Sequence, residues 1–127
     1  MIFGVGTDVV EIGRIEKALE RFGERFAKRI LCPPELKRFE KHKLKANYLA
    51  KRFAAKEAFT KALGTGIHAP ANWHGVWVAN LPSGKPILDF STELRLLMEK
   101  KGVSSSHVSL TDERGIAMAT VILECEK

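Results

Sequence analysis

The chain has 127 residues, of which 45% are hydrophobic and 28% are charged, and its formal net charge is +6. This length is close to the commonest size of a single domain, and the balance of apolar and charged residues argues against disordered and fibrous proteins. Two cysteines, far apart in the sequence, exclude a disulfide framework or a zinc ribbon and fit a reducing compartment.

The positive charge is concentrated in one half of the chain. Residues 1–66 contain 15 Lys and Arg against 8 Asp and Glu, whereas residues 67–127 contain 6 against 7. Such a field favours an anionic partner (nucleic acid, a phosphate-rich small molecule or an acidic protein), and a surface that promotes solubility explains it equally well. The longest uncharged stretch, Ala62–Gly84, is broken by Gly and Pro and is not expected to span a membrane. The N-terminal apolar stretch reaches Asp8 before it attains the length of a signal peptide. We expect a soluble, cytoplasmic protein with no membrane partner.

The first half of the chain predicts one strand followed by helices, in the order Ile2–Val10, Glu11–Ile30, Glu35–His42 and Asn47–Leu63. Gly23 is placed to divide the first helical stretch in two. Pro33-Pro34 ends that stretch and can open the next helix. Gly64 stands where a C-terminal glycine cap belongs.

The second half predicts strands around one helix, in the order Gly75–Ala79, Ile87–Phe90, Ser91–Lys101, His107–Thr111 and Gly115–Glu124. Ser91 and Gly102 suit the two caps of the helix, and the last two strands form a hairpin around Asp112–Arg114. We therefore expect an α+β fold in one domain, residues 1–127, with a small antiparallel sheet packed on the long helix.

Asp8 interrupts an apolar strand. A carboxylate there needs a cation or several hydrogen-bond donors to offset its desolvation, which would make it a functional residue. The alternative is an N-cap for the helix that starts near Glu11, and for Asp8 alone this is the better interpretation.

Glu57 and Lys61 are four residues apart on the long helix, with Phe53 one turn earlier on the same face. Taken alone, such a pair is usually an ordinary ion pair that stabilises the helix by roughly a few tenths of a kcal/mol.

A row of basic residues follows the helix Glu11–Ile30 beside its apolar stripe. If the helix runs straight, they fall within one arc: Arg14, Lys17, Arg21, Arg25 and Lys28. Because like charges on one arc repel each other, an anionic partner is modestly favoured over plain solubility. In the last hairpin, His107, Ser109 and Thr111 share one side of a strand, which suits either solvent or phosphate oxygens.

Taken together, several segments resemble one family. They are Gly6–Ile12, Arg52–Ala58 followed by Lys61 and Gly64–Gly66, then Gly84–Pro86 and finally His107–Leu110. In this order and at this length they resemble the holo-acyl-carrier-protein synthases, the short bacterial type of 4′-phosphopantetheinyl transferase. The resemblance covers almost the whole chain.

The resemblance implies that a phosphopantetheine arm is transferred from coenzyme A to a serine of an acidic apo-acyl carrier protein. Adenosine 3′,5′-bisphosphate would be released, and the holo-carrier would serve fatty acid synthesis. Family members are magnesium-dependent homotrimers with active sites at the subunit interfaces.

The resemblance also implies residue roles. Asp8 and Glu57 would bind Mg²⁺, Lys61 would meet the charge on the departing phosphate, and the general base is either Glu57 or a metal-bound water. Contacts to coenzyme A would come from Phe53, Lys61, Gly64, Thr65, Gly66, Ile67, Lys85, Pro86, His107 and Ser109. The carrier protein would dock on Arg14, Lys17, Arg21, Arg25 and Lys28.

Two other classes compete with this hypothesis. A nucleic-acid-binding module fits the basic charge, but the basic row lacks interleaved aromatic residues for base stacking, so we expect no nucleic acid partner. An inactive structural trimer is disfavoured because Asp8, Glu57 and Lys61 are all present.

Overall fold

The computed structural model describes residues 1–126. Its elements follow in the order β1 (Ile2–Glu11), α1 (Ile12–Phe22), α2 (Glu24–Ile30), α3 (Pro33–Lys41), α4 (Lys45–Leu63), β2 (Val76–Asn80), β3 (Pro86–Phe90), α5 (Thr92–Lys101), β4 (Val103–Glu113) and β5 (Ile116–Cys125).

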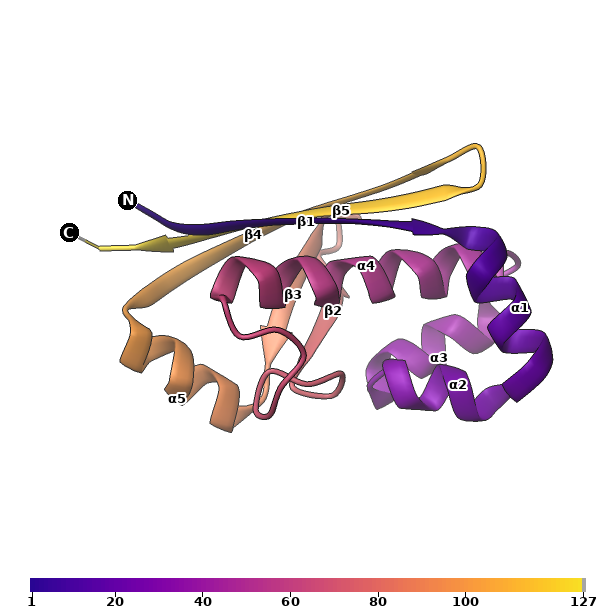
Figure 1. Ribbon diagram of the computed structural model, residues 1–127, viewed down its shortest axis with the longest axis horizontal. Coiled ribbons are helices and arrows are strands. Elements are labelled where there is room, and N and C mark those ends of the chain that lie inside the picture. The colour runs from indigo at the N-terminus through magenta and orange to yellow at the C-terminus, as the bar shows by residue number, and fades with distance from the viewer. Residues whose placement is uncertain (127) are drawn as a thin grey trace.

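A three-stranded antiparallel sheet with α4 along one face forms the centre of the molecule (Figure 1). Strand β5 lies between β1 and β4, and β2 pairs with β3 in a separate two-stranded sheet. Helices α1, α2 and α3 gather near one end of α4, and α5 lies at the other end (Figure 1). This arrangement confirms the expected α+β fold with its sheet packed on the long helix.

Strand β1 lies directly against α4 because two glycines leave no side chains between them. A Cβ atom at Gly6 would lie 1.9 Å from the carbonyl oxygen of Ala58, and one at Gly4 would lie 2.0 Å from that of Ala62. Neither position accepts a larger residue without moving the backbone. Side chains alternate along a strand, so the next residue on this face, Asp8, also points toward α4.

The helix ends follow the predicted capping residues. Gly64 and Gly102 both adopt the left-handed conformation that ends a helix, with φ of 88°, and the Ser91 hydroxyl accepts a hydrogen bond from the backbone N–H of Leu94. The break at Gly23, where φ is 60°, separates α1 from α2. The basic row of residues is therefore divided between two helices instead of following one straight arc.

Several predicted boundaries differ from the structure. The last hairpin turns at Arg114-Gly115, not around Asp112–Arg114, and both turn residues have positive φ, 51° and 80°. This is the geometry of a two-residue turn that matches the twist of its strands. Strand β4 is longer than expected and begins at Val103. Helix α3 begins at Pro33, because the two prolines lie inside its first turn, where no backbone N–H is needed.

The face of the sheet away from α4 carries exposed apolar side chains. Val5 and Val9 on β1 are 54% and 58% exposed, and Ile116 and Met118 on β5 are 44% and 39% exposed. Within residues 1–126, no helix is both long enough and apolar enough to cross a bilayer.

Candidate active site

A cleft of about 440 Å³ opens between β1, α1, α2 and α4. One end of the cleft is charged and is formed by Asp8, Glu57 and Lys61. The other end is apolar and includes Phe26 and Phe53. Asp8 and Glu57 meet here because the two glycines of β1 let the strand lie close to the helix. The fold therefore brings together Asp8, Glu57 and Lys61, the three residues that the motifs singled out.

The Lys61 ammonium reaches from α4 to β1. Its Nζ lies 3.1 Å from Asp8 Oδ1 and donates a second hydrogen bond, 3.0 Å long, to the backbone carbonyl of Thr7. The expected helical ion pair between Glu57 and Lys61 is absent from the ion pairs of the described residues, where Lys61 pairs with Asp8. Asp8 lies within β1, opposite Ala119, so the N-cap interpretation of this residue is wrong.

Glu57 lies half-buried beside Asp8, and its protonation is affected accordingly. Burial raises the pKa of the Glu57 carboxyl above its ordinary value, the negative charge of Asp8 raises it further, and Lys61 partly opposes both effects. Two carboxylates that repel each other across a cleft form a site where a bound cation would be stabilised. A carboxylate with a raised pKa is also a better proton acceptor near neutral pH.

A magnesium ion needs few carboxylates from the protein. Within residues 1–126 there is no group of three or more Asp, Glu, His or Cys side chains that could enclose a metal. Asp8 and Glu57 are therefore the carboxylates that the cleft provides. This fits Mg²⁺, which is usually held by one or two carboxylates, phosphate oxygens of a substrate and retained waters. It does not fit a structural zinc site, which needs four protein ligands.

The apolar end of the cleft is supported from behind by an aromatic pair. The ring of Phe53 packs on the ring of Trp73, with centroids 4.9 Å apart and planes inclined by 31°. Phe26 lies on α2, and Ile15 and Ala18 lie on α1, so the walls of this end come from different helices. Arg14 also lines the cleft, so one residue of the basic row belongs to its wall.

The predicted glycine-rich segment follows α4 directly. Gly64 caps the helix one turn after Lys61, and Gly66 has a φ of 67°. A Cβ atom at either glycine would meet nothing within 4 Å, so the space beside this loop is open. Thr65 Oγ1 donates to the carbonyl of Gly66, and Ile67 is half-buried.

The other predicted contacts to coenzyme A are not brought to this cleft within one chain. Lys85 and Pro86 lie at the start of β3. His107 and Ser109 lie on the face of the sheet away from α4, where His107 Nε2 is 2.6 Å from Glu124 Oε1. Asp8 points to the opposite side of the same sheet, so these residues and the carboxylate pair are separated by the sheet itself.

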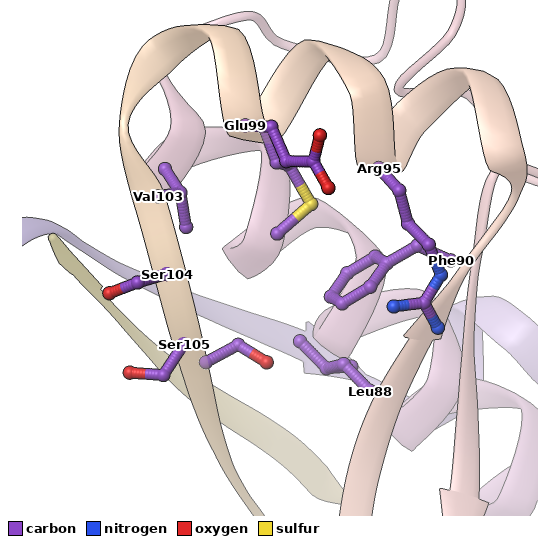
Figure 2. Close-up of a pocket in the computed structure, with 9 residues that line it drawn as sticks. Leu88, Phe90, Arg95, Glu99, Val103, Ser104 and Ser105 are labelled. Atoms are coloured by element: carbon purple, nitrogen blue, oxygen red, sulfur yellow. The ribbon is translucent and has the colours of Figure 1, made fainter.

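A second hollow, of about 310 Å³, lies between α5, β3 and β4 (Figure 2). Its floor includes Leu88 and Phe90, and Arg95 and Glu99 stand on one rim (Figure 2). Arg95 forms an ion pair with Asp89 and also lies over the ring of Phe90. None of the predicted site residues lines this hollow, so it is separate from the cleft.

Comparison with known proteins decides between the classes considered for this chain. Residues 4–121 match the model of the 4′-phosphopantetheinyl transferase superfamily. A holo-[acyl-carrier-protein] synthase of Pseudoalteromonas atlantica is 52% identical over 123 residues, which cover 97% of each chain. The chain belongs to the holo-[acyl-carrier-protein] synthase family.

Solved structures of this family have the same fold. The Neisseria meningitidis synthase superimposes with a TM-score of 0.94 at 42% identity, covering 98% of this chain and 99% of that one. The Bacillus anthracis synthase, solved in complex with CoA (3′,5′-ADP), gives 0.83 at 37% identity, with 99% of each chain covered. The Helicobacter pylori synthase, solved with coenzyme A, gives 0.83 at 32% identity, with coverage of 94% and 99%.

The structure also places exposed Phe22 beside the basic row of this family member. Phe22 is 45% exposed at the end of α1. Together with Phe26, Arg25 and Arg29 it lines a shallow hollow of about 380 Å³. The sequence did not show this exposure, because Phe22 falls on the apolar stripe of the helical stretch Glu11–Ile30, a pattern that predicts burial.

Arg52 begins the motif Arg52–Ala58 on α4. Its side chain is buried beneath Tyr48, with the guanidinium carbon 4.0 Å from the centre of the ring. One guanidinium nitrogen donates a 3.3 Å hydrogen bond to Asn80 Oδ1, and Nε has no partner. Asn80 in turn donates to the carbonyl of Gly84, so Arg52 lies behind the turn that leads to Lys85.

Proposed function

We propose that this chain transfers the 4′-phosphopantetheine group of coenzyme A to a serine of an acidic apo-acyl carrier protein, with Mg²⁺ as cofactor. The products would be adenosine 3′,5′-bisphosphate and a holo-carrier for fatty acid synthesis, made in the cytoplasm. The observation that carries this proposal is the cleft in which Asp8, Glu57 and Lys61 converge. Family membership and the coenzyme A complexes of relatives agree with it.

In this mechanism the serine hydroxyl attacks the phosphorus next to the pantetheine arm. A new P–O bond forms to the serine, and the bond to the bridging oxygen of the pyrophosphate breaks. Mg²⁺ held by Asp8 and Glu57 would neutralise charge on the pyrophosphate. The serine proton would be accepted by Glu57, directly or through a water molecule.

Lys61 has a separate role in this proposal. Its ammonium already lies at the charged end of the cleft, between β1 and α4, and is 53% exposed. A cation in this position would stabilise the negative charge that grows on the departing adenosine bisphosphate. The hydrogen bond to the Thr7 carbonyl would hold Lys61 in place when Asp8 binds a metal ion.

The remaining contacts to coenzyme A are proposed to come from two chains. Phe53, Lys61 and the loop Gly64–Ile67 would act from the chain that supplies the metal ligands. A neighbouring chain would supply Lys85, Pro86, His107 and Ser109. Within one chain, the sheet separates His107 and Ser109 from Asp8.

We further propose a homotrimer that covers the exposed apolar residues of the outer sheet face. Val5, Val9, Ile116 and Met118 would be buried by such contacts. Sedimentation of the protein should give a trimer, and Met118→Glu, at an exposed position that does not line the cleft, should give a monomer without transferase activity. A wild-type protein that sediments as a monomer at micromolar concentration and is fully active would contradict this proposal.

The transfer itself is tested by intact-mass spectrometry of an apo-acyl carrier protein incubated with the chain, coenzyme A and magnesium. We expect a gain of about 340 Da, the mass of a phosphopantetheinyl group. The gain should be lost with Asp8→Ala and with Glu57→Ala, and kept with Glu93→Ala, which removes an acid from the first turn of α5. An unchanged carrier mass, with a known transferase active on the same sample, would refute the proposal for that carrier.

A further inference from the structure

A buried ion pair lies next to the cleft, and the proposed chemistry does not use it. Lys56 Nζ lies 2.7 Å from Glu35 Oε1, and both side chains are fully buried, with exposures of 0%. Lys56 directly precedes Glu57 in α4 but is not among the side chains that line the cleft. A charge with no access to water is costly unless all its hydrogen bonds are made, so each partner of this pair matters.

The Lys56 ammonium has three N–H donors, and each has an acceptor. One donates to the carbonyl of Ile30 at 2.6 Å, one to Glu35 at 2.7 Å and one to the carbonyl of Trp73 at 2.7 Å. Ile30 is the last residue of α2, and Trp73 lies in the loop between α4 and β2. Lys56 thus ties two backbone segments to α4.

Glu35 extends these ties to two further segments. Its Oε1 accepts a 2.9 Å hydrogen bond from the backbone N–H of Cys32, which closes the first turn of α3. Its Oε2 accepts another of 2.9 Å from the backbone N–H of Val78 in β2. The pair therefore joins α2, α3, α4, the loop and β2 through hydrogen bonds whose donors and acceptors are all satisfied.

Both carbonyls that Lys56 holds belong to segments that shape the apolar end of the cleft. Ile30 ends the helix that carries Phe26, and Phe26 lines this end. The Trp73 ring packs against Phe53, which lines it too. A shift of either backbone segment would move an aromatic wall relative to Glu57.

We propose that Lys56, paired with Glu35, is a positioning residue that sets the apolar end of the cleft and through it the reaction with the carrier protein. A buried ion pair is often no more stabilising than two apolar side chains of similar size. Apolar side chains, however, cannot hold two carbonyls and two backbone N–H groups at fixed positions. The part that concerns the carrier protein rests on the proposed function.

The test uses a Trp77→Phe background, which leaves Trp73 as the only tryptophan of the chain. In this background we would compare Lys56→Met, the double variant Glu35→Gln/Lys56→Met and the control Leu49→Ala. The double variant removes both charges and leaves neither unpaired. Leu49 is fully buried in α4 and does not line the cleft, so the control loses stability without touching these ties. We would measure the fluorescence emission of Trp73, its quenching by acrylamide, and the KM values for carrier protein and coenzyme A. All measurements are made at a temperature where circular dichroism shows that each variant is folded.

For the two Lys56 variants we expect a red shift of Trp73 emission and faster quenching. We also expect a rise in the carrier KM of about tenfold, since small displacements in a reactive site have large kinetic effects. The coenzyme A KM should rise as well, because Phe53 packs on Trp73 and is a proposed coenzyme A contact, and Leu49→Ala should keep the parent values of emission and KM.

Parent-like Trp73 emission and carrier KM in either folded Lys56 variant would overturn the proposal. The same changes in Leu49→Ala would also overturn it, because they would then follow from lost stability alone. Trp73 emission needs no catalysis. A parent protein without transferase activity would refute the proposed function, while the emission would still show whether Lys56 holds the loop.

Discussion

Replacing Gly6 by alanine tests whether the close approach of β1 and α4 builds the site. The new Cβ would lie 1.9 Å from the Ala58 carbonyl oxygen, 2.7 Å from the Ala62 nitrogen and 2.9 Å from the Ala58 carbonyl carbon. All three are backbone atoms, so no flexible side chain can turn aside, and the strand has to move away from the helix. Overpacking of a core costs about 1–3 kcal/mol, and the rigid neighbours place Gly6→Ala at about 3 kcal/mol.

This cost translates into a measurable shift of the melting temperature. An unfolding entropy of about 2.1 cal/mol/K per residue gives roughly 0.27 kcal/mol/K for a chain of this length, and hence a loss of about 11 °C. Calorimetry on the purified variant measures the shift directly. Transferase activity should fall as well, because a displaced β1 carries Asp8 and the Thr7 carbonyl away from Lys61.

Gly13→Ala is the matched control. Gly13 lies in α1, a Cβ atom there would meet nothing within 4 Å, and its φ is not positive. Alanine at such a helical position should raise stability by about 0.5–1 kcal/mol. The reasoning is refuted if Gly6→Ala melts within about 2 °C of the parent, a shift equivalent to about 0.5 kcal/mol.

Further predictions concern charge and protonation. Reversing Arg14 and Arg21 to glutamate should raise the carrier-protein KM at least about tenfold and leave coenzyme A affinity nearly unchanged, because both charges would face the acidic carrier protein proposed as partner. In metal-free protein, the raised pKa of Glu57 means that the folded state binds the proton more tightly, so stability from this group is present at low pH and is lost as the pH rises above about 4.5. Asp8→Asn should weaken that dependence, as measured by urea unfolding and by the carboxyl carbon shift of Glu57. Burial raises the pKa of the Cys32 thiol to about 11, so a thiol reagent at pH 8 should modify Cys32 only after unfolding.

Each of these predictions has an outcome that contradicts it. Reversal of Lys100 and Lys101, exposed on α5, serves as the control for the two arginines, and equal kinetics in both double variants would remove the docking role. A Glu57 carboxyl that titrates at its ordinary pKa would show that burial and Asp8 do not perturb it. Rapid modification of two thiols in the folded protein would show that Cys32 is accessible.

The charged end of the cleft could be predicted from the sequence because its residues lie in distinctive local motifs. Asp8 interrupts an apolar strand, and Glu57 and Lys61 share one face of a helix without Gly or Pro. The sequence did not show which carboxylate Lys61 pairs with. Its side chain reaches across to Asp8 on β1 and does not pair with Glu57 on its own helix. That choice depends on the distance between β1 and α4, which is determined by Gly4 and Gly6, more than fifty residues before Lys61.

Other features escaped prediction for related reasons. Glu35 and Lys56 are charged residues on helices, a pattern that ordinarily indicates a solvent-exposed face. Their pairing across 21 residues depends on tertiary packing alone. The hairpin turn was misplaced because Asp112 is a typical turn residue, whereas in the structure Asn47 and Lys51 hold its carboxylate within the strand. Tertiary partners of this kind override local turn preference.

The ties made by Lys56 and Glu35 also restrict how this sequence can change over evolutionary time. Loss of one partner leaves an unpaired charge in the core and costs about 3–5 kcal/mol, a large part of the stability of a domain, whereas loss of both can be nearly neutral. A lineage would therefore rarely pass through the single replacements. The two positions should be retained together or exchanged together, so that residues on α3 and α4 are inherited as a unit although neither touches substrate.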